Sequence, residues 1–145
     1  MSAIPFTQRE LKRAMKELST VATLPGGNAR TNPHRLMLFY AVECGLKAVW
    51  LKRQSRSLFD KDDITKTGHD LRQVLKDLKV GSQLSLPASI QLSEVVQDKK
   101  SVARGGDISI LHQAWRYGGE CKTPTDRDCE TQLEKVLNWI QGELK

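Results

Sequence analysis

Apolar residues recur every three or four positions along most of this chain, which is the period of an amphipathic α-helix. The segment 34–53 differs, because apolar side chains occupy nearly every face of it from Leu36 to Leu51. A helix that is apolar all round belongs in a protein interior. We therefore expect residues 34–53 to form the central and most buried helix, with Asn32 as its N-cap and Pro33 in its first turn.

Five other segments carry an apolar stripe with helical spacing or a fragment of one. The first begins at Thr7, which stands three residues before Glu10 in the arrangement of a capping box. The stripes are Leu11, Ala14, Met15 and Leu18 in this first helix; Leu71, Val74, Leu75 and Leu78 before a stop at Gly81; Ile90, Val95 and Val96 in a weaker helix over 87–97; Ile108, Leu111 and Trp115 over 108–117; and Leu133, Val136, Leu137 and Ile140 over 126–144.

Polar, charged or glycine-rich stretches at 24–33, 54–66, 98–107 and 118–125 separate these segments and indicate connections. No segment alternates convincingly between apolar and polar residues, as a half-buried strand would. A chain of 145 residues is long enough to bury a core of its own. The pattern predicts one all-α domain over 1–145, an up-and-down bundle of five to six helices with antiparallel neighbours.

The charge balance suggests an anionic partner. Lysine and arginine outnumber aspartate and glutamate by 23 to 17, which gives a net charge of +6 and a pI near 9.4. Such an excess favours association with a polyanion at low salt, and a nucleic acid or nucleotide is the first partner to consider. The alternative is that the charge serves only solubility, because no block of Lys and Arg interleaved with aromatic residues stands out.

The cysteines and the N-terminus bear on the cellular compartment. Cys44, Cys121 and Cys129 have neither the even count of a disulfide framework nor the close spacing of a zinc site. The first residues lack a signal peptide, and Glu43 and Lys47 interrupt the longest apolar stretch. We expect a reduced, cytoplasmic protein that does not span a membrane and carries no metal or other cofactor.

Three short motifs occur in a particular order along the chain. They are Glu43 and Lys47 on the central helix, His69-Asp70-Leu71 at the start of a later helix, and Trp115-Arg116-Tyr117 before the last helix. In this order the motifs resemble those of the HEPN (higher eukaryotes and prokaryotes nucleotide-binding) domain, and the similarity covers roughly residues 34–144.

The resemblance implies an α-helical bundle that forms a homodimer and acts in a prokaryotic toxin–antitoxin or phage-defence system. It also implies that the ligand is RNA, a nucleotide or a neighbour-encoded protein such as a minimal nucleotidyltransferase. Many family members are metal-independent endoribonucleases, in which an Arg is followed after four to six residues by a His, and two protomers join these residues in one site.

This sequence departs from the ribonuclease spacing. Three residues separate Arg30 from His34, and seven separate Arg104 from His112. The similarity is strongest to the branch marked by His-Asp-Leu and Arg-Tyr, whose members are more often binding or partner modules.

His69 and Asp70 allow more than one interpretation. In a catalytic pair Asp70 would orient the imidazole, but adjacent helix residues point about 100° apart, which makes direct orientation awkward. In the structural interpretation Asp70 caps its helix, or stands three residues after an N-cap at Thr67, and His69 bonds across to Glu43. With Lys47, which is spaced to pair with Glu43, these residues would form a structural polar cluster. A ligand contact is the third interpretation.

The best phosphate-contact candidates by local sequence are Arg30, His34 and Arg35. They gather around the start of the central helix, where free backbone N–H groups and the helix dipole favour an anion. A solvated helix start is the default alternative. Arg104, which precedes a Gly-Gly pair, is a second candidate of the same kind.

His112 and Arg116 are four residues apart and share a helix face, with Tyr117 following. Arginine can hold a phosphate with two donors, and histidine can transfer a proton near neutral pH. These residues therefore predict a phosphate-binding site or, together with His34, the catalytic groups of an endoribonuclease. The structural alternative has Arg116 bracing a buried carboxylate such as Glu43 while Tyr117 packs. A helical adaptor that acts only through protein contacts is the remaining functional hypothesis.

Overall fold

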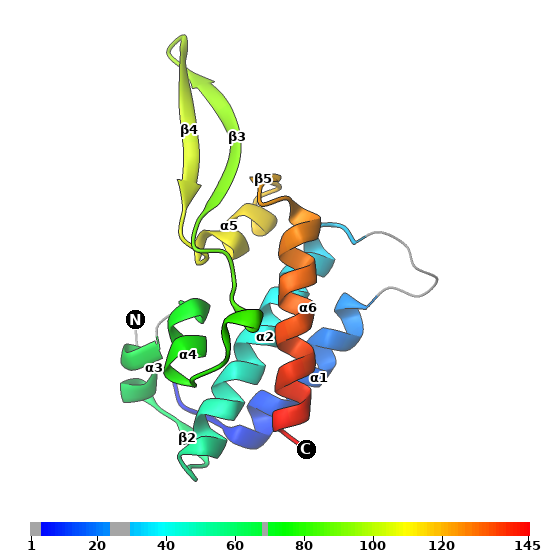
Figure 1. Ribbon diagram of the computed structural model, residues 1–145, viewed down its shortest axis with the longest axis vertical. Helices are drawn as coiled ribbons and strands as arrows, with labels where there is room; N and C mark the ends of the chain where they lie inside the picture. The colour runs from blue at the N-terminus through cyan, green and yellow to red at the C-terminus, as the bar shows by residue number, and fades with distance from the viewer. Residues whose placement is uncertain (1–3, 24–29, 68–69) are drawn as a thin grey trace.

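The computed structural model describes residues 4–23, 30–67 and 70–145. Over this part the chain forms six α-helices, a short 3-10 helix and five strands in two antiparallel sheets (Figure 1). In chain order the elements are β1 (Phe6–Thr7), α1 (Gln8–Ala22), α2 (Asn32–Arg53), β2 (Leu58–Phe59), α3 (Lys61–Thr67), α4 (Leu71–Asp77), η2 (Ser82–Leu84), β3 (Ile90–Gln97), β4 (Lys100–Gly106), α5 (Ile110–Arg116), β5 (Cys121–Thr123) and α6 (Asp126–Glu143). The protein is mixed α/β, so the predicted all-α bundle of five to six helices is wrong.

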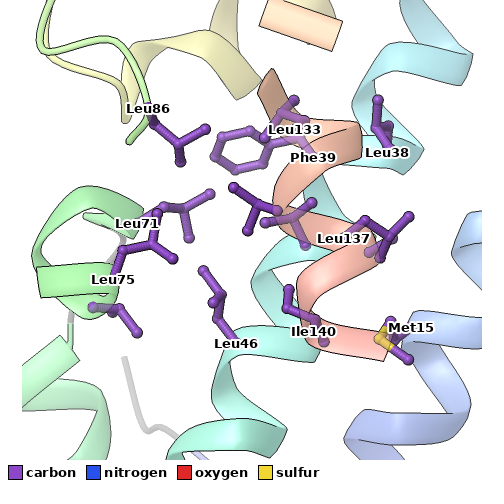
Figure 2. Close-up of a cluster of buried hydrophobic side chains, with 14 of the residues drawn as sticks. Met15, Leu38, Phe39, Leu46, Leu71, Leu75, Leu86, Leu133, Leu137 and Ile140 are labelled. Atoms are coloured by element: carbon purple, nitrogen blue, oxygen red, sulfur yellow. The ribbon is translucent and has the colours of Figure 1, made fainter. Parts of the chain in front are cut away.

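The helices pack around α2, as the apolar pattern of 34–53 predicts. α1 and α6 both contact α2 along its length, and α5 and α4 contact it as well (Figure 1). Figure 2 shows side chains of α1, α2, α4 and α6 meeting in one apolar cluster. The α2 residues buried in this core are Leu38, Phe39, Ala41, Val42, Gly45, Leu46, Ala48, Val49 and Leu51, more than any other described helix contributes.

Gly45 sets how closely the helices approach. A Cβ atom added at Gly45 would lie 2.7 Å from Cγ2 of Ile140 in α6 and 2.8 Å from the sulfur of Met15 in α1. Real Cβ atoms essentially never come within 3.0 Å of a neighbour. The missing side chain therefore lets three helices meet at one level of the core, where packing is dense.

Local signals predict the start of α1 correctly and misplace the N-cap of α2 by one residue. Glu10 N donates to Thr7 Oγ1 at 3.1 Å and Thr7 N donates to Glu10 Oε1 at 2.9 Å, which is the predicted capping box of α1. α2 begins at Asn32, so its N-cap is Thr31 and not Asn32. The Asn32 side chain instead donates from Nδ2 to the carbonyl of Gly119 at 3.1 Å.

The predicted helix over 87–97 and the predicted loop over 98–107 are both wrong, because these residues form the hairpin of β3 and β4. It extends away from the helices (Figure 1), with Ile90 opposite Gly106 at its base and a turn at Asp98-Lys99. Both turn residues have positive φ, 53° and 62°, as a two-residue hairpin turn requires. Much of the hairpin is solvated on both faces, so the alternation that identifies a half-buried strand is missing.

Two further predicted connections contain regular structure. Within 54–66, β2 pairs with β1 and α3 begins, and α3 buries the charged residue Asp63. Within 118–125, β5 pairs with β3, which places Cys121 opposite Leu92. These elements are too short to show an apolar period, and pairing with distant residues holds them. None of the helices in the described ranges is long and apolar enough to cross a lipid bilayer.

Candidate functional site

Carboxylates of α6 engage Arg30 and Arg35. Arg30 Nη1 lies 3.1 Å from Glu130 Oε1 and also contacts Glu134, while Arg35 Nε lies 3.0 Å from Glu130 Oε2. Arg30 Nε donates to the carbonyl of Ala22 at 2.7 Å. These contacts join the end of α1, the start of α2 and one face of α6. Because the carboxylates offset both positive charges, the arrangement favours a structural role for the two arginines over a phosphate contact.

His34 lies in the first turn of α2, next to the two arginines. Its Nδ1 atom is 2.8 Å from Oγ1 of Thr31, the N-cap residue. The Thr31 hydroxyl makes no capping hydrogen bond to the backbone and is used by the imidazole instead. His34 thus belongs to the local structure of the helix start.

The predicted structural polar cluster is visible in part. Lys47 Nζ lies 3.3 Å from Glu43 Oε1, as their spacing predicts. Asp70 is the N-cap of α4, and its Oδ1 accepts hydrogen bonds from the backbone of residues 72 and 73 at 3.1 and 3.2 Å. Thr67, the alternative N-cap, is the last residue of α3. His69, with its predicted bond to Glu43, lies outside the described residues.

His112 and Arg116 lie one turn apart on α5, and both face α2. The rings of His112 and Phe39 have centroids 5.6 Å apart, and Arg116 Nη2 donates to the hydroxyl of Tyr40. Hydrogen bonds with Tyr40 and then Tyr117 raise the pKa of the Arg116 guanidinium above its usual range, so it stays a cation. The side chain that Arg116 braces is therefore Tyr40, and Tyr117 is 77% exposed where the structural alternative expected it to pack.

Two predicted ligand residues, Arg104 and Tyr117, come together at the base of the hairpin. They line a groove of about 420 Å³ between β3, β4 and α5, which we call the hairpin-base groove. Its lining residues are Leu92, Ala103, Arg104, Gly105, Ile110, Gln113, Ala114, Tyr117 and Gly119. The lining thus combines aliphatic side chains, an exposed aromatic ring, a guanidinium and an amide.

Two glycines shape the end of α5 beside the groove. Gly118 has a φ of +81°, a conformation that favours glycine and ends the helix. Gly119 leaves space, because a Cβ there would lie 2.8 Å from Leu92 Cδ2 and 3.1 Å from the carbonyl oxygen of Ala114. The bond from Asn32 to the Gly119 carbonyl fixes this corner to the start of α2.

The groove has a positive edge. Arg104 Nε donates to the carbonyl of Ser93 across the hairpin at 2.9 Å, which holds the guanidinium in place, and the residue is exposed. Among the described residues, no carboxylate forms an ion pair with Arg104 at the groove or with Arg116 on α5. This distinguishes both side chains from Arg30 and Arg35.

Sequence reasoning missed the lining residues Leu92, Ile110 and Gln113. Leu92 and Ile110 fall within the predicted helices over 87–97 and 108–117 but outside their apolar stripes, and no pattern in the sequence indicates that β3 packs against α5. The sequence does predict Tyr117 and Arg104 as ligand residues, but that they share one groove is recognisable only once the strands are known.

Within the described ranges, no group of three or more His, Cys, Asp and Glu side chains is placed to hold a metal ion. No protein-family model matches the sequence, and comparisons with curated proteins and with solved structures find no match.

Proposed function

We propose that this protein binds a nucleotide or a single RNA strand in the hairpin-base groove. The observation that carries the proposal is the pairing of an exposed aromatic ring, Tyr117, with an arginine that has no acidic partner, Arg104, across one groove. Aromatic side chains stack on nucleobases, and a guanidinium binds phosphate with two donors.

The remaining lining residues suit the same ligand. Leu92 and Ile110 offer apolar contact to the face of a base, and the Gln113 amide can both donate to and accept from a base edge. A volume of about 420 Å³ lies in the range of small-molecule sites, which is about 300–1,000 Å³. The net charge of +6 favours the approach of an anion.

The biological setting follows from the HEPN resemblance. We propose a homodimeric binding or partner module of a prokaryotic toxin–antitoxin or phage-defence system, with a neighbour-encoded protein such as a nucleotidyltransferase as a further partner. Glu43 lies on α2, Asp70 caps α4 and Arg116 lies on α5, and this order along the chain supports the relation. The β3–β4 hairpin is an addition to the helical pattern that the resemblance implies.

A metal-independent endoribonuclease is the second candidate. It is favoured by the position of His112 and Arg116, which lie one turn apart beside Phe39 and Tyr40. Incubation with total RNA in the presence of a chelator tests it, and His112→Ala should abolish cleavage. Intact RNA at high protein concentration would remove this candidate.

The binding proposal is tested by titrating the protein with AMP and with a short fluorescent RNA. Stacking contributes about 1–3 kcal/mol per base, so Tyr117→Ala should weaken binding roughly 5- to 150-fold. Arg104→Gln should weaken RNA binding as well. Phe6→Ala, which removes another exposed aromatic ring, and Arg127→Gln, which removes another exposed arginine, are the matched controls. Equal losses in the controls, or no binding by the unaltered protein, would contradict the proposal.

A further inference from the structure

Four basic side chains form a continuous stripe along α1. Arg9, Lys12, Arg13 and Lys16 have i, i+3, i+4, i+7 spacing, which puts them on one side of the helix. They line a shallow hollow together with Gln8. At a rise of about 1.5 Å per residue, the stripe is roughly 10 Å long.

These four cations form no ion pair with a carboxylate in the part of the chain that the structure describes. The two acids of α1, Glu10 and Glu17, lie to one side of the stripe by the helical period. Glu10 is also held in the capping box, where it accepts a hydrogen bond from Thr7 N at 2.9 Å. Arg9, Arg13 and Lys16 are exposed and Lys12 is half-buried, so most of the charge of the stripe faces solvent. Only Arg13 lies close enough to Glu10 to help the hydrogen bonds from Thr7 lower the pKa of that carboxyl.

The residues in and beside the stripe indicate which class of partner it binds: a membrane surface, a protein or a nucleic acid. A helix that inserts into a membrane surface needs an available apolar face, but Leu11 and Met15 of α1 are 7% and 3% exposed and belong to the core. The energetic centre of a protein interface is a set of Trp, Tyr and Arg side chains in well-packed, desolvated pockets, whereas Arg9 and Arg13 stand among lysines with no apolar or aromatic residue in the lining. A nucleic-acid strand requires neither an apolar helix face nor a buried anchor residue, because its phosphates bind closely spaced cations.

The spacing fits such a strand. In a duplex one strand carries a phosphate about every 3.4 Å of axis, and the phosphates of an extended single strand are further apart, so a stripe of roughly 10 Å reaches about two or three phosphates. We propose that α1 is a docking surface for the phosphate backbone of a nucleic-acid strand, that it does not depend on base sequence, and that it is separate from the hairpin-base groove. The natural ligand is then a polynucleotide and not a mononucleotide.

The salt dependence of RNA binding tests this proposal. Each cation that contacts a single strand contributes about 0.7 to the slope of log affinity against log salt. Lys12→Gln/Lys16→Gln should therefore reduce the slope measured with a fluorescent oligouridylate by about 1.4. Lys76→Gln/Lys135→Gln removes the same charge from exposed positions on α4 and α6 and should leave the slope nearly unchanged. Circular dichroism checks that both double variants keep their helix content.

The outcomes separate this proposal from the proposed function. Binding of AMP should be unchanged in Lys12→Gln/Lys16→Gln, whereas Tyr117→Ala should weaken RNA binding and leave the slope as it is. Equal slopes in the two double variants would overturn the docking surface. Binding to phosphatidylserine vesicles without binding to RNA would overturn it too. If AMP does not bind but the slope difference persists, the groove proposal fails and the docking surface stands.

Discussion

Arg56 donates two hydrogen bonds to the buried carboxylate of Asp63, from Nη1 to Oδ1 and from Nη2 to Oδ2, each 2.6 Å long. The same carboxylate accepts hydrogen bonds from Trp50 Nε1 at 3.1 Å and from the backbone N of Asp60 at 2.9 Å. Asp63 is 1% exposed, so these four donors replace its water. The arrangement anchors α3 and the turn before it to α2.

This carboxylate makes stability depend on pH. The hydrogen bonds from Arg56 hold the pKa of Asp63 well below its ordinary value of 3.8. Because the folded-state pKa is the lower one, the stabilisation is present above the ordinary pKa and is lost as the pH falls below it. We expect the free energy of unfolding, measured with urea, to fall below about pH 4. Asp63→Asn should show a shallower fall, and parallel curves would exclude Asp63 as the cause.

Removing the charge of Asp63 should also destabilise the protein at neutral pH. Breaking a buried ion pair costs about 3–5 kcal/mol. Arg56 is about one-third exposed, so we expect a loss of about 2–3 kcal/mol for Asp63→Asn. Asp62→Asn, at the exposed neighbouring position, should change the free energy of unfolding by less than about 0.5 kcal/mol. Similar losses in the two variants would contradict this account.

Gly45→Ala should destabilise the core by about 1–3 kcal/mol, because the new methyl group would collide with Ile140 and Met15. Gly142, in the last turn of α6, is the matched control, since an added Cβ meets nothing within 4 Å there. Gly142→Ala should be neutral or stabilise by about 0.5–1 kcal/mol through helix propensity. Chemical denaturation measures both, and a Gly45→Ala protein as stable as the original would show that the helices can separate without cost.

The three cysteines are free thiols and should react slowly in the folded state. The hydrogen bond with Cys129 and then burial raise the pKa of the Cys121 thiol, and burial raises that of Cys44. The thiolate is the reactive form, so both shifts slow the reaction. In a thiol titration with a disulfide reagent, Cys44, which is half-buried, should react before the buried Cys121 and Cys129. Unfolding should make all three react at once, and rapid labelling of Cys121 in the folded protein would contradict its burial.

Gly119→Ala should disturb the hairpin-base groove more than the core. The added Cβ would press on Leu92 and the Ala114 carbonyl, so the hairpin must shift slightly from α5. We expect weaker RNA binding than in the unaltered protein and a loss of about 1 kcal/mol in stability. Gly81→Ala, where an added Cβ meets nothing within 4 Å, is the control, and unchanged RNA binding by Gly119→Ala would argue against a ligand at this corner.

The sequence predicts those parts of the fold that depend on neighbours along the chain. The Thr7–Glu10 capping box, the buried α2 and the long α6 all follow from patterns within a few turns of helix, where the residues that stabilise one another are three or four apart. The Glu43–Lys47 pair has the same origin. These predictions are confirmed because no distant contact competes with the local ones.

The candidate site is less accessible to such reasoning. The sequence predicts Tyr117 and Arg104 as ligand residues of separate sites, and only the packing of the β3–β4 hairpin against α5 puts them in one groove. Conversely, the basic stripe of α1 was readable from its spacing and was overlooked beside the apolar stripe of the same helix. The structure adds that, within the described residues, these cations form no ion pairs.

By itself the sequence determined the long helices α1, α2 and α6. The spacing of apolar residues specifies which side of a helix is buried, and this does not depend on which element packs against that side. Only the tertiary structure decided the roles of the arginines. Arg30 reads as an anion contact at a helix start, yet Glu130, 100 positions away, takes up its charge, while Arg104 remains available at the groove. The same holds for the hairpin, whose strands stabilise each other through cross-strand hydrogen bonds that a one-dimensional pattern does not contain.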